Sequence, residues 1–142
     1  MSTRVGVAVA VATVALAGCG GESQSQKAQK SVCDARADIS RQVDELKGLT
    51  VATASVDGVR QNLDAIQKDL RQIADARPTL RESRRAEVKA ATDKFTSSMA
   101  DIVQGLTSNL SLSAAGPQLQ AAAQSLRTAY ADSLGKIDCS SG

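Results

Sequence analysis

The stretch VDGVRQNLDAIQKDLRQI, residues 56–73, decides the fold of this chain. Its apolar residues follow alternating spacings of three and four positions: Val56, Val59, Leu63, Ile66, Leu70 and Ile73. That alternation places all of them on one face of an α-helix, as in the seam of a coiled coil. Ser55 precedes the stretch as a candidate N-cap. Arg77-Pro78 follows it and ends the predicted helix, because the residue before a proline disfavours helical backbone.

Three other segments have the same helical period, and no segment shows the alternation of a strand. Residues 32–47 carry the stripe Val32, Ile39, Val43 and Leu46, between an N-cap at Ser31 and a stop at Gly48. A capping box of Thr79 and Glu82 opens the next segment, whose stripe is Val88, Ala91, Phe95, Met99, Ile102, Leu106 and Leu110. The last segment opens at Gly116-Pro117 and carries Leu119, Ala122, Leu126, Tyr130, Leu134 and Ile137.

Each of these helices has one apolar stripe to bury. The simplest closed arrangement is an all-α fold, an antiparallel four-helix bundle. In a bundle whose helices alternate in direction, the start of the first helix and the end of the fourth lie at the same end. Cys33 and Cys139 occupy those two positions.

The N-terminal residues have the composition of a secretory signal. Arg4 precedes an apolar run, residues 5–15, which is shorter than the roughly 20 residues that span a bilayer. The next four residues, Leu16-Ala17-Gly18-Cys19, resemble the lipobox of bacterial lipoproteins. The resemblance implies that Cys19 is diacylated and becomes the first residue of the mature chain, with two acyl chains (palmitate-type) that anchor it stably in a membrane. The alternative is an ordinary signal peptide that is cleaved nearby.

We therefore expect three parts: a lipoprotein signal peptide at 1–18, a flexible polar tether at 19–30 and a helical bundle domain at 31–142. The expected location is the cell membrane of a bacterial envelope, with the bundle on the extracytoplasmic side. In that oxidising compartment, and with Cys19 consumed by lipid, Cys33 and Cys139 are an even pair. We predict a Cys33–Cys139 disulfide that closes the bundle, the alternative being two buried free thiols.

The composition excludes several classes of function. The 142 residues include no His, which removes His-based acid–base catalysis and His-containing zinc sites. The formal net charge of only +2 argues against a nucleic-acid partner. No motif for a phosphate cradle or an activated nucleophile occurs, so we expect no catalytic residue, no metal and no cofactor.

Two surfaces are candidates for binding. The first is a basic cluster of Arg77, Arg81, Arg84, Arg85 and Lys89, which could contact anionic lipid headgroups or a charged envelope polymer. The alternative for this cluster is a solvated helix face.

The second candidate lies within residues 102–126, which carry no Asp, Glu, Lys or Arg. Its polar residues Gln104, Ser108, Ser111 and Gln118 can form hydrogen bonds without the desolvation cost of a charge, as suits a surface that a partner covers. We expect this face near the connection between the third and fourth helices, at the end away from Cys33. The alternative is a neutral connection without a partner.

The expected function is that of a membrane-anchored envelope lipoprotein, a non-enzymatic interaction or scaffolding module with an envelope protein as partner. A carrier or binder of a small hydrophobic ligand or lipid is the alternative, although Phe95 and Tyr130 are the only aromatic residues and aromatic side chains usually line ligand pockets. A hydrolase that uses only Asp, Ser and Lys is a third, more distant class.

Overall fold

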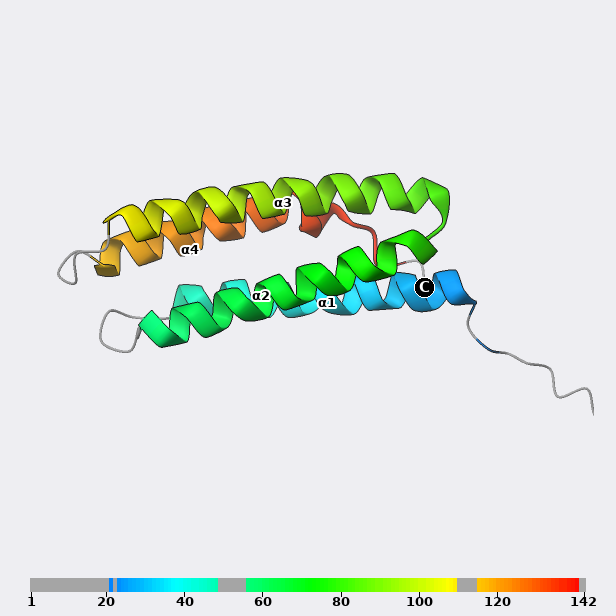
Figure 1. Ribbon diagram of the computed structural model, residues 1–142, viewed down its shortest axis with the longest axis horizontal. Helices are drawn as coiled ribbons and strands as arrows, with labels where there is room; N and C mark the ends of the chain where they lie inside the picture. The colour runs from blue at the N-terminus through cyan, green and yellow to red at the C-terminus, as the bar shows by residue number, and fades with distance from the viewer. Residues whose placement is uncertain (1–20, 22, 49–55, 110–114, 141–142) are drawn as a thin grey trace, which may run out of the picture.

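The computed structural model describes residues 21, 23–48, 56–109 and 115–140, and within these ranges the chain forms helices and no strand. The helices are α1 (Gln24–Gly48), α2 (Val56–Ala76), α3 (Glu82–Asn109) and α4 (Ala115–Asp132). Short 3₁₀ turns follow α2 and α4, namely η1 (Arg77–Thr79) and η2 (Leu134–Lys136). Successive helices are antiparallel, with α1 and α2 in one layer and α3 and α4 in the other (Figure 1). The predicted antiparallel four-helix bundle is confirmed.

All four helices contribute apolar side chains to one core. Phe95 of α3 is completely buried, and its ring meets the ring of Tyr130 edge-on at a centroid distance of 6.3 Å. The predicted stripes of α1 and α2 supply the buried residues Val32, Ile39, Val43, Leu46, Ile66, Leu70 and Ile73. The helical period of the sequence therefore identified the core face correctly.

The first helix begins at Gln24, earlier than the predicted start, so residues 24–30 of the expected tether are helical. The cause is a capping box. The backbone amide of Ser23 donates to Gln26 Oε1 at 2.8 Å, and the amide of Gln26 donates to Ser23 Oγ at 3.2 Å. Ala28 then extends the buried stripe one turn before Val32. The remaining tether, from Cys19 to Ser23, is short.

The connection between α2 and α3 differs in detail from the prediction. The helix α2 ends at Ala76, as Arg77-Pro78 predicts, but Thr79 lies in η1 and α3 begins at Glu82. The predicted capping box of Thr79 and Glu82 therefore does not open α3. The amides of Arg84 and Arg85 instead bond to the carbonyl oxygen of Arg81. Leu80 is buried, so its contact with the core holds the turn in place.

The fourth helix ends earlier than its apolar stripe suggests. It stops at Asp132, and Ser133 leaves helical geometry with its hydroxyl donating to the carbonyl oxygen of Ala129. At Gly135 an added Cβ would lie 3.1 Å from the carbonyl oxygen of Tyr130, so the tight turn favours glycine. Leu134 and Ile137 remain buried as the chain crosses toward α1. We call residues 133–140 the C-terminal strap.

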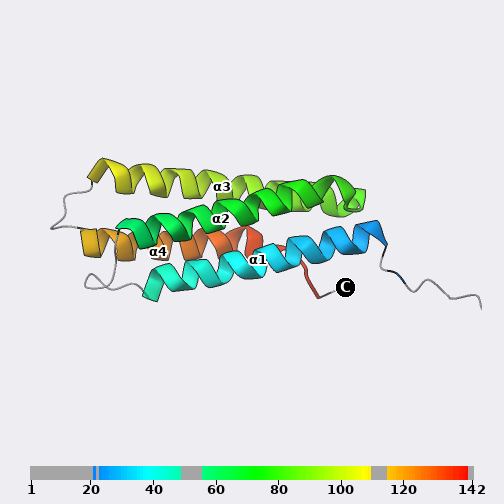
Figure 2. The ribbon, with the colours of Figure 1, turned by 60° about the horizontal axis from the view of Figure 1, so that its bottom comes forward.

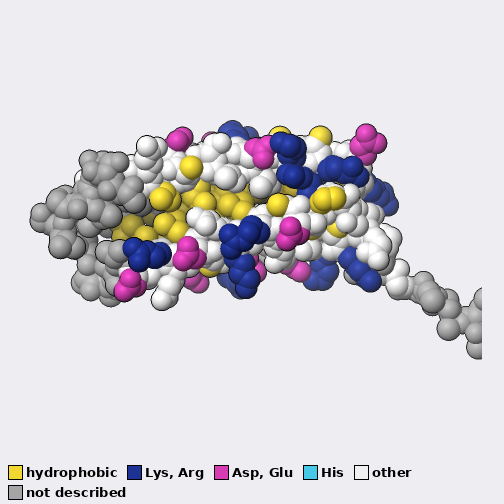
Figure 3. Space-filling model, viewed as in Figure 1, with side chains coloured by type: hydrophobic (Ala, Val, Ile, Leu, Met, Phe, Trp, Pro, Cys, Tyr) yellow, Lys and Arg dark blue, Asp and Glu magenta, His cyan; other side chains and the backbone are white. Residues whose placement is uncertain are grey.

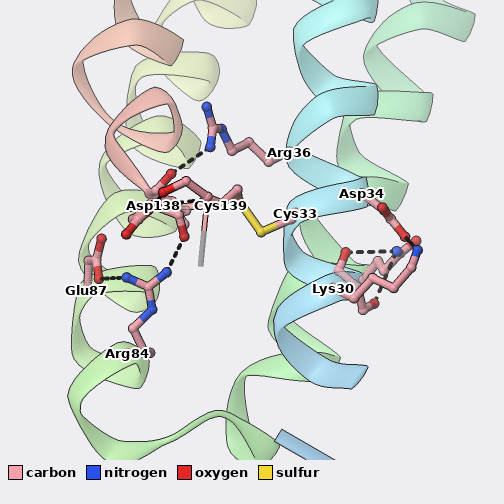
Figure 4. The surroundings of a disulfide bond; sticks show 12 residues. Lys30, Cys33, Asp34, Arg36, Arg84, Glu87, Asp138 and Cys139 are labelled. Carbon is pink, nitrogen blue, oxygen red and sulfur yellow. Dashed lines mark hydrogen bonds and ion pairs between the residues drawn. A yellow bond between two sulfur atoms is a disulfide. The ribbon is translucent and has the colours of Figure 1, made fainter. Parts of the chain in front are cut away.

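The strap carries the predicted disulfide. Cys139 is bonded to Cys33 of α1, with a Cα–Cα distance of 5.8 Å and a sequence separation of 106 residues (Figure 4). Arg36 of α1 donates to the carbonyl oxygen of Ile137 at 2.6 Å, and Arg84 of α3 donates to the carbonyl oxygen of Asp138. The strap thus ties α4 covalently to α1 and by a hydrogen bond to α3.

Candidate functional site

An apolar groove separates α2 from α3. These helices converge at η1 and diverge toward the opposite end of the bundle (Figures 1 and 2). Residue contacts between α2 and α3 are sparser than those within the α1–α2, α3–α4 or α1–α4 pairs. The resulting hollow has a volume of about 680 Å³ and lies within the size range of ligand-binding clefts.

The floor of this groove is apolar. Leu70 of α2 and Met99 of α3 lie at its base, each less than a tenth exposed, and Val103 continues the base along α3. Ala74 and Ala100 form the walls, and because their side chains are short they leave the base accessible. Figure 3 shows this apolar strip between the two layers.

The polar rim of the groove changes character along its length. Arg71 and Arg77 line it toward the η1 end, where α2 finishes. Gln67 and Gln104 line the wide end, and both are uncharged and exposed. The carboxylate of Asp93, on the α3 rim, is bound by Lys89. Among the residues that the structure describes, Arg71 and Arg77 have no ion-pair partner, so the η1 end of the groove is cationic.

The α1–α2 edge, in contrast, is closed by polar side chains. Gln72 donates to the carbonyl oxygen of Ser31 at 3.1 Å, and Gln42 donates to Asp69 Oδ2 at 2.9 Å. Asn62 donates to Glu45 at 3.3 Å near the far end of the same pair. These bonds follow the antiparallel register of α1 and α2 and keep the two helices together.

The α1–α4 edge is closed by a residue pair that reaches across it. Tyr130 donates its hydroxyl proton to the carbonyl oxygen of Arg36 at 3.2 Å. The Nε atom of Arg36 donates to the Tyr130 hydroxyl oxygen at 3.3 Å. The α2–α3 edge has no comparable pair among the described residues, which is why the groove opens there.

The residues of the predicted basic cluster have different surroundings in the structure. Arg84 is bound to Glu87 at 3.0 Å and to the C-terminal strap, Arg85 donates to the carbonyl oxygen of Leu80 at 3.1 Å, and Lys89 is paired with Asp93. Arg77 lines the groove, and Arg81 is exposed without a side-chain partner in the described part of the chain. Arg84 is therefore a structural residue, while Arg77 and Arg81 keep their charges available.

The structure describes only part of the predicted partner face. Gln104 lines the groove, and α4 starts at the end of the bundle opposite the start of α1 (Figure 1). The connection itself, residues 110–114, lies outside the described residues. Gln118 of α4 is half-buried and does not line the groove, and its Oε1 atom is buried without a hydrogen-bond partner. Ser111 and the side chain of Ser108 lie outside the described residues, as does Cys19.

Sequence reasoning assigned Leu70 and Met99 to the core and overlooked Arg71. A weak signal was present, because Gln67, Arg71 and Ala74 form a row beside the main seam of α2. The short side chains of Ala74 and Ala100, which line the groove on α2 and on α3, give no sequence signal of an opening.

No protein-family model, no curated protein and no solved structure matches this chain. None of the described helices combines the length and the apolar character that crossing a membrane requires. In the same described ranges, no three His, Cys, Asp or Glu side chains cluster in a way that could hold a metal ion. The α2–α3 groove is the candidate site because its apolar base is accessible between the two helices.

Proposed function

We propose that this chain is a membrane-anchored lipoprotein of the bacterial envelope and acts as a non-enzymatic interaction module. The lipobox resemblance of residues 16–19 supports an acyl anchor at Cys19 and an extracytoplasmic location. The Cys33–Cys139 disulfide supports the same location, because disulfides persist in oxidising compartments. The observation that carries the binding role is the apolar groove between α2 and α3.

The proposed occupant of the groove is an amphipathic helix of an envelope protein. The groove follows α2 from Gln67 to Arg77, about 15 Å at 1.5 Å per residue, which matches roughly three turns of a partner helix. A helix that binds in such a groove inserts apolar residues at positions i, i+3, i+4 and i+7. Leu70, Met99 and Val103 offer the apolar base for these anchors, and the flexible Met99 adapts to their shape.

The charges on the rim give the partner helix a direction. Arg71 and Arg77 favour acidic residues on the segment near η1, whereas Gln67 and Gln104 favour uncharged polar residues at the wide end. Such complementary charges select the orientation and speed up the encounter more than they raise the affinity. We therefore expect a partner helix that inserts an apolar face into the groove and carries acidic residues at the end near η1.

The test is site-specific photo-crosslinking of the acylated protein in its native envelope. A photoreactive residue at Ala100, in the groove, should capture a helical peptide that carries acidic residues. The same probe at Ala131, an exposed residue of α4 outside the groove, is the matched control and should not capture it. Reversing Arg71 and Arg77 to Glu should lower the yield at Ala100 about tenfold, which corresponds to ~1.4 kcal/mol.

Three outcomes would contradict this proposal. Equal capture at Ala100 and Ala131 would mean that the groove is not the site. A lipid adduct at Ala100 in place of a peptide would favour the alternative function, a binder of a small hydrophobic ligand. A crosslinking yield that stays the same after Arg71 and Arg77 are reversed to Glu would show that the rim charges do not contribute to binding.

A further inference from the structure

The short tether restricts where the bundle can lie. Only four residues lie between Cys19 and Gln24, the first residue of α1, so five residue-to-residue steps connect them. An extended chain covers at most about 3.6 Å per residue, so α1 starts within ~18 Å of an acylated Cys19. This step rests on the proposed anchorage at Cys19. One end of the bundle is then held close to the lipid headgroups.

The end that is held there also contains the turn between α2 and α3. Figures 1 and 2 show the start of α1, η1 and the start of α3 at one end of the molecule, opposite the end of α1 and the start of α4. The disulfide and the C-terminal strap connect α1, α3 and α4 at this end. The Cys33–Cys139 disulfide is therefore a covalent cross-link at this end of the bundle. We call it the tethered end.

The tethered end carries cationic side chains that face solvent. Three of these side chains are exposed, namely Lys27, Arg81 and Arg85. Arg77, the first residue of η1, is half-buried. Two of the carboxylates there are paired with cations, Asp34 with Lys30 and Glu87 with Arg84, whereas Asp138 accepts hydrogen bonds from Ser140 and keeps its charge. Glu82 and Asp75 are exposed and reduce the positive charge without cancelling it.

The opposite end has the reverse balance of charge. Its acidic residues are Asp44, Glu45, Asp57, Asp64 and Asp101, and they outnumber Arg41, Lys47 and Arg60. Figure 3 shows Lys and Arg side chains gathered over the end where α3 begins. The bundle therefore has a charge asymmetry along its long axis, which a negatively charged membrane surface can orient.

We propose that the tethered end rests directly on the membrane, with Lys27, Arg81 and Arg85 in contact with the phosphates of anionic phospholipids. The bundle then projects away from the bilayer, and the wide end of the groove points away from the lipid. The tether is longer than the Debye length of about 8 Å at physiological salt, so the cations act on the headgroups only where the tethered end lies directly against them. Each such cation raises the partition onto an anionic surface about fivefold.

The test measures vesicle binding by the mature chain, residues 19–142, with Cys19→Ser, which lacks both the acyl anchor and the apolar signal segment. Co-sedimentation compares vesicles that contain phosphatidylglycerol with vesicles of pure phosphatidylcholine, at low and high salt. The triple variant Lys27→Glu, Arg81→Glu and Arg85→Glu should lose about a hundredfold in affinity for the anionic vesicles. The matched control, Arg41→Glu, Lys47→Glu and Arg60→Glu, changes the net charge equally and should lose less than fivefold.

Equal losses in the two triple variants would overturn the proposal, because net charge and not the tethered end would then control binding. Absence of any preference for anionic over zwitterionic vesicles would overturn it as well. Circular dichroism of both variants checks that the helices are intact. A failure here leaves the proposed function standing, since acylation of Cys19 is tested separately by the mass of the native chain and the groove by crosslinking.

Discussion

At the scale of single residues, identical side chains in one sequence cluster have different roles. Arg81 and Arg84 are neighbours on the predicted basic face, yet only Arg84 is drawn into the fold. Its side chain is 21% exposed, binds Glu87 and donates to the carbonyl oxygen of Asp138 in the C-terminal strap (Figure 4). A hydrogen bond from a charged group contributes more to stability than an exposed ion pair does. The two arginines should therefore respond differently to truncation.

Arg84→Ala should lower the free energy of unfolding by about 1–2 kcal/mol, because the strap loses a charged donor and Glu87 loses its partner. Arg81→Ala should change it by less than about 0.5 kcal/mol, as is usual for an exposed residue without partners. Urea unfolding of both variants measures the difference. Equal effects would show that the contact of Arg84 with the strap does not contribute to stability.

At the scale of elements, the length of α1 depends on its first turn. The reciprocal bonds of Ser23 and Gln26 satisfy backbone amides that the start of a helix leaves without partners. Ala28 and Val32 then bury the apolar side of the added turns. Local capping and tertiary burial agree here, and together they shorten the segment between Cys19 and the first helix.

Ser23→Ala should destabilise the start of α1 by about 1 kcal/mol, since the N-cap bond to the amide of Gln26 is lost. Amide hydrogen exchange should accelerate about fivefold at residues 26–28 and remain unchanged in α3. Ser97→Ala, at an exposed position within α3, is the control and should not accelerate exchange. Unchanged exchange in α1 of the Ser23 variant would contradict the capping role.

At the scale of the whole molecule, the strap and its disulfide compensate for a core with few large side chains. Phe95 is the only Phe of the chain, and much of the remaining core consists of Val, Leu, Ile and Ala. The Cys33–Cys139 bond closes a loop of 106 residues and so restricts the unfolded chain strongly. The same bond holds the C-terminal strap against α1 at the tethered end.

The double variant Cys33→Ser and Cys139→Ser should unfold with a free energy lower by about 2–5 kcal/mol, the usual cost of removing a native disulfide. Denaturant unfolding of the Cys19→Ser chain, with and without the two further substitutions, measures this loss. Adding reductant to the parent chain should reproduce it. In the oxidised parent, a thiol-alkylating reagent should label neither cysteine; two labelled thiols without reduction would contradict the disulfide.

The sequence by itself determined the four helices, their antiparallel order and the disulfide. Helical period is a local property, so the apolar stripe of α2 could be read from residues 56–73 directly. The pairing of Cys33 with Cys139 follows from the parity of four alternating helices. The early start of α1 could also have been predicted from the sequence, because Ser23 and Gln26 have the spacing of a capping box.

Only the tertiary structure decided where the bundle opens and which cations remain available. The groove depends on the distance between α2 and α3 and on the short side chains of Ala74 and Ala100, and no periodic pattern encodes either. Likewise, the difference between Arg81 and Arg84 arises from a strap that returns from residues 133–140. Contacts between residues far apart in the sequence are set by packing, which is why the groove became visible only in three dimensions.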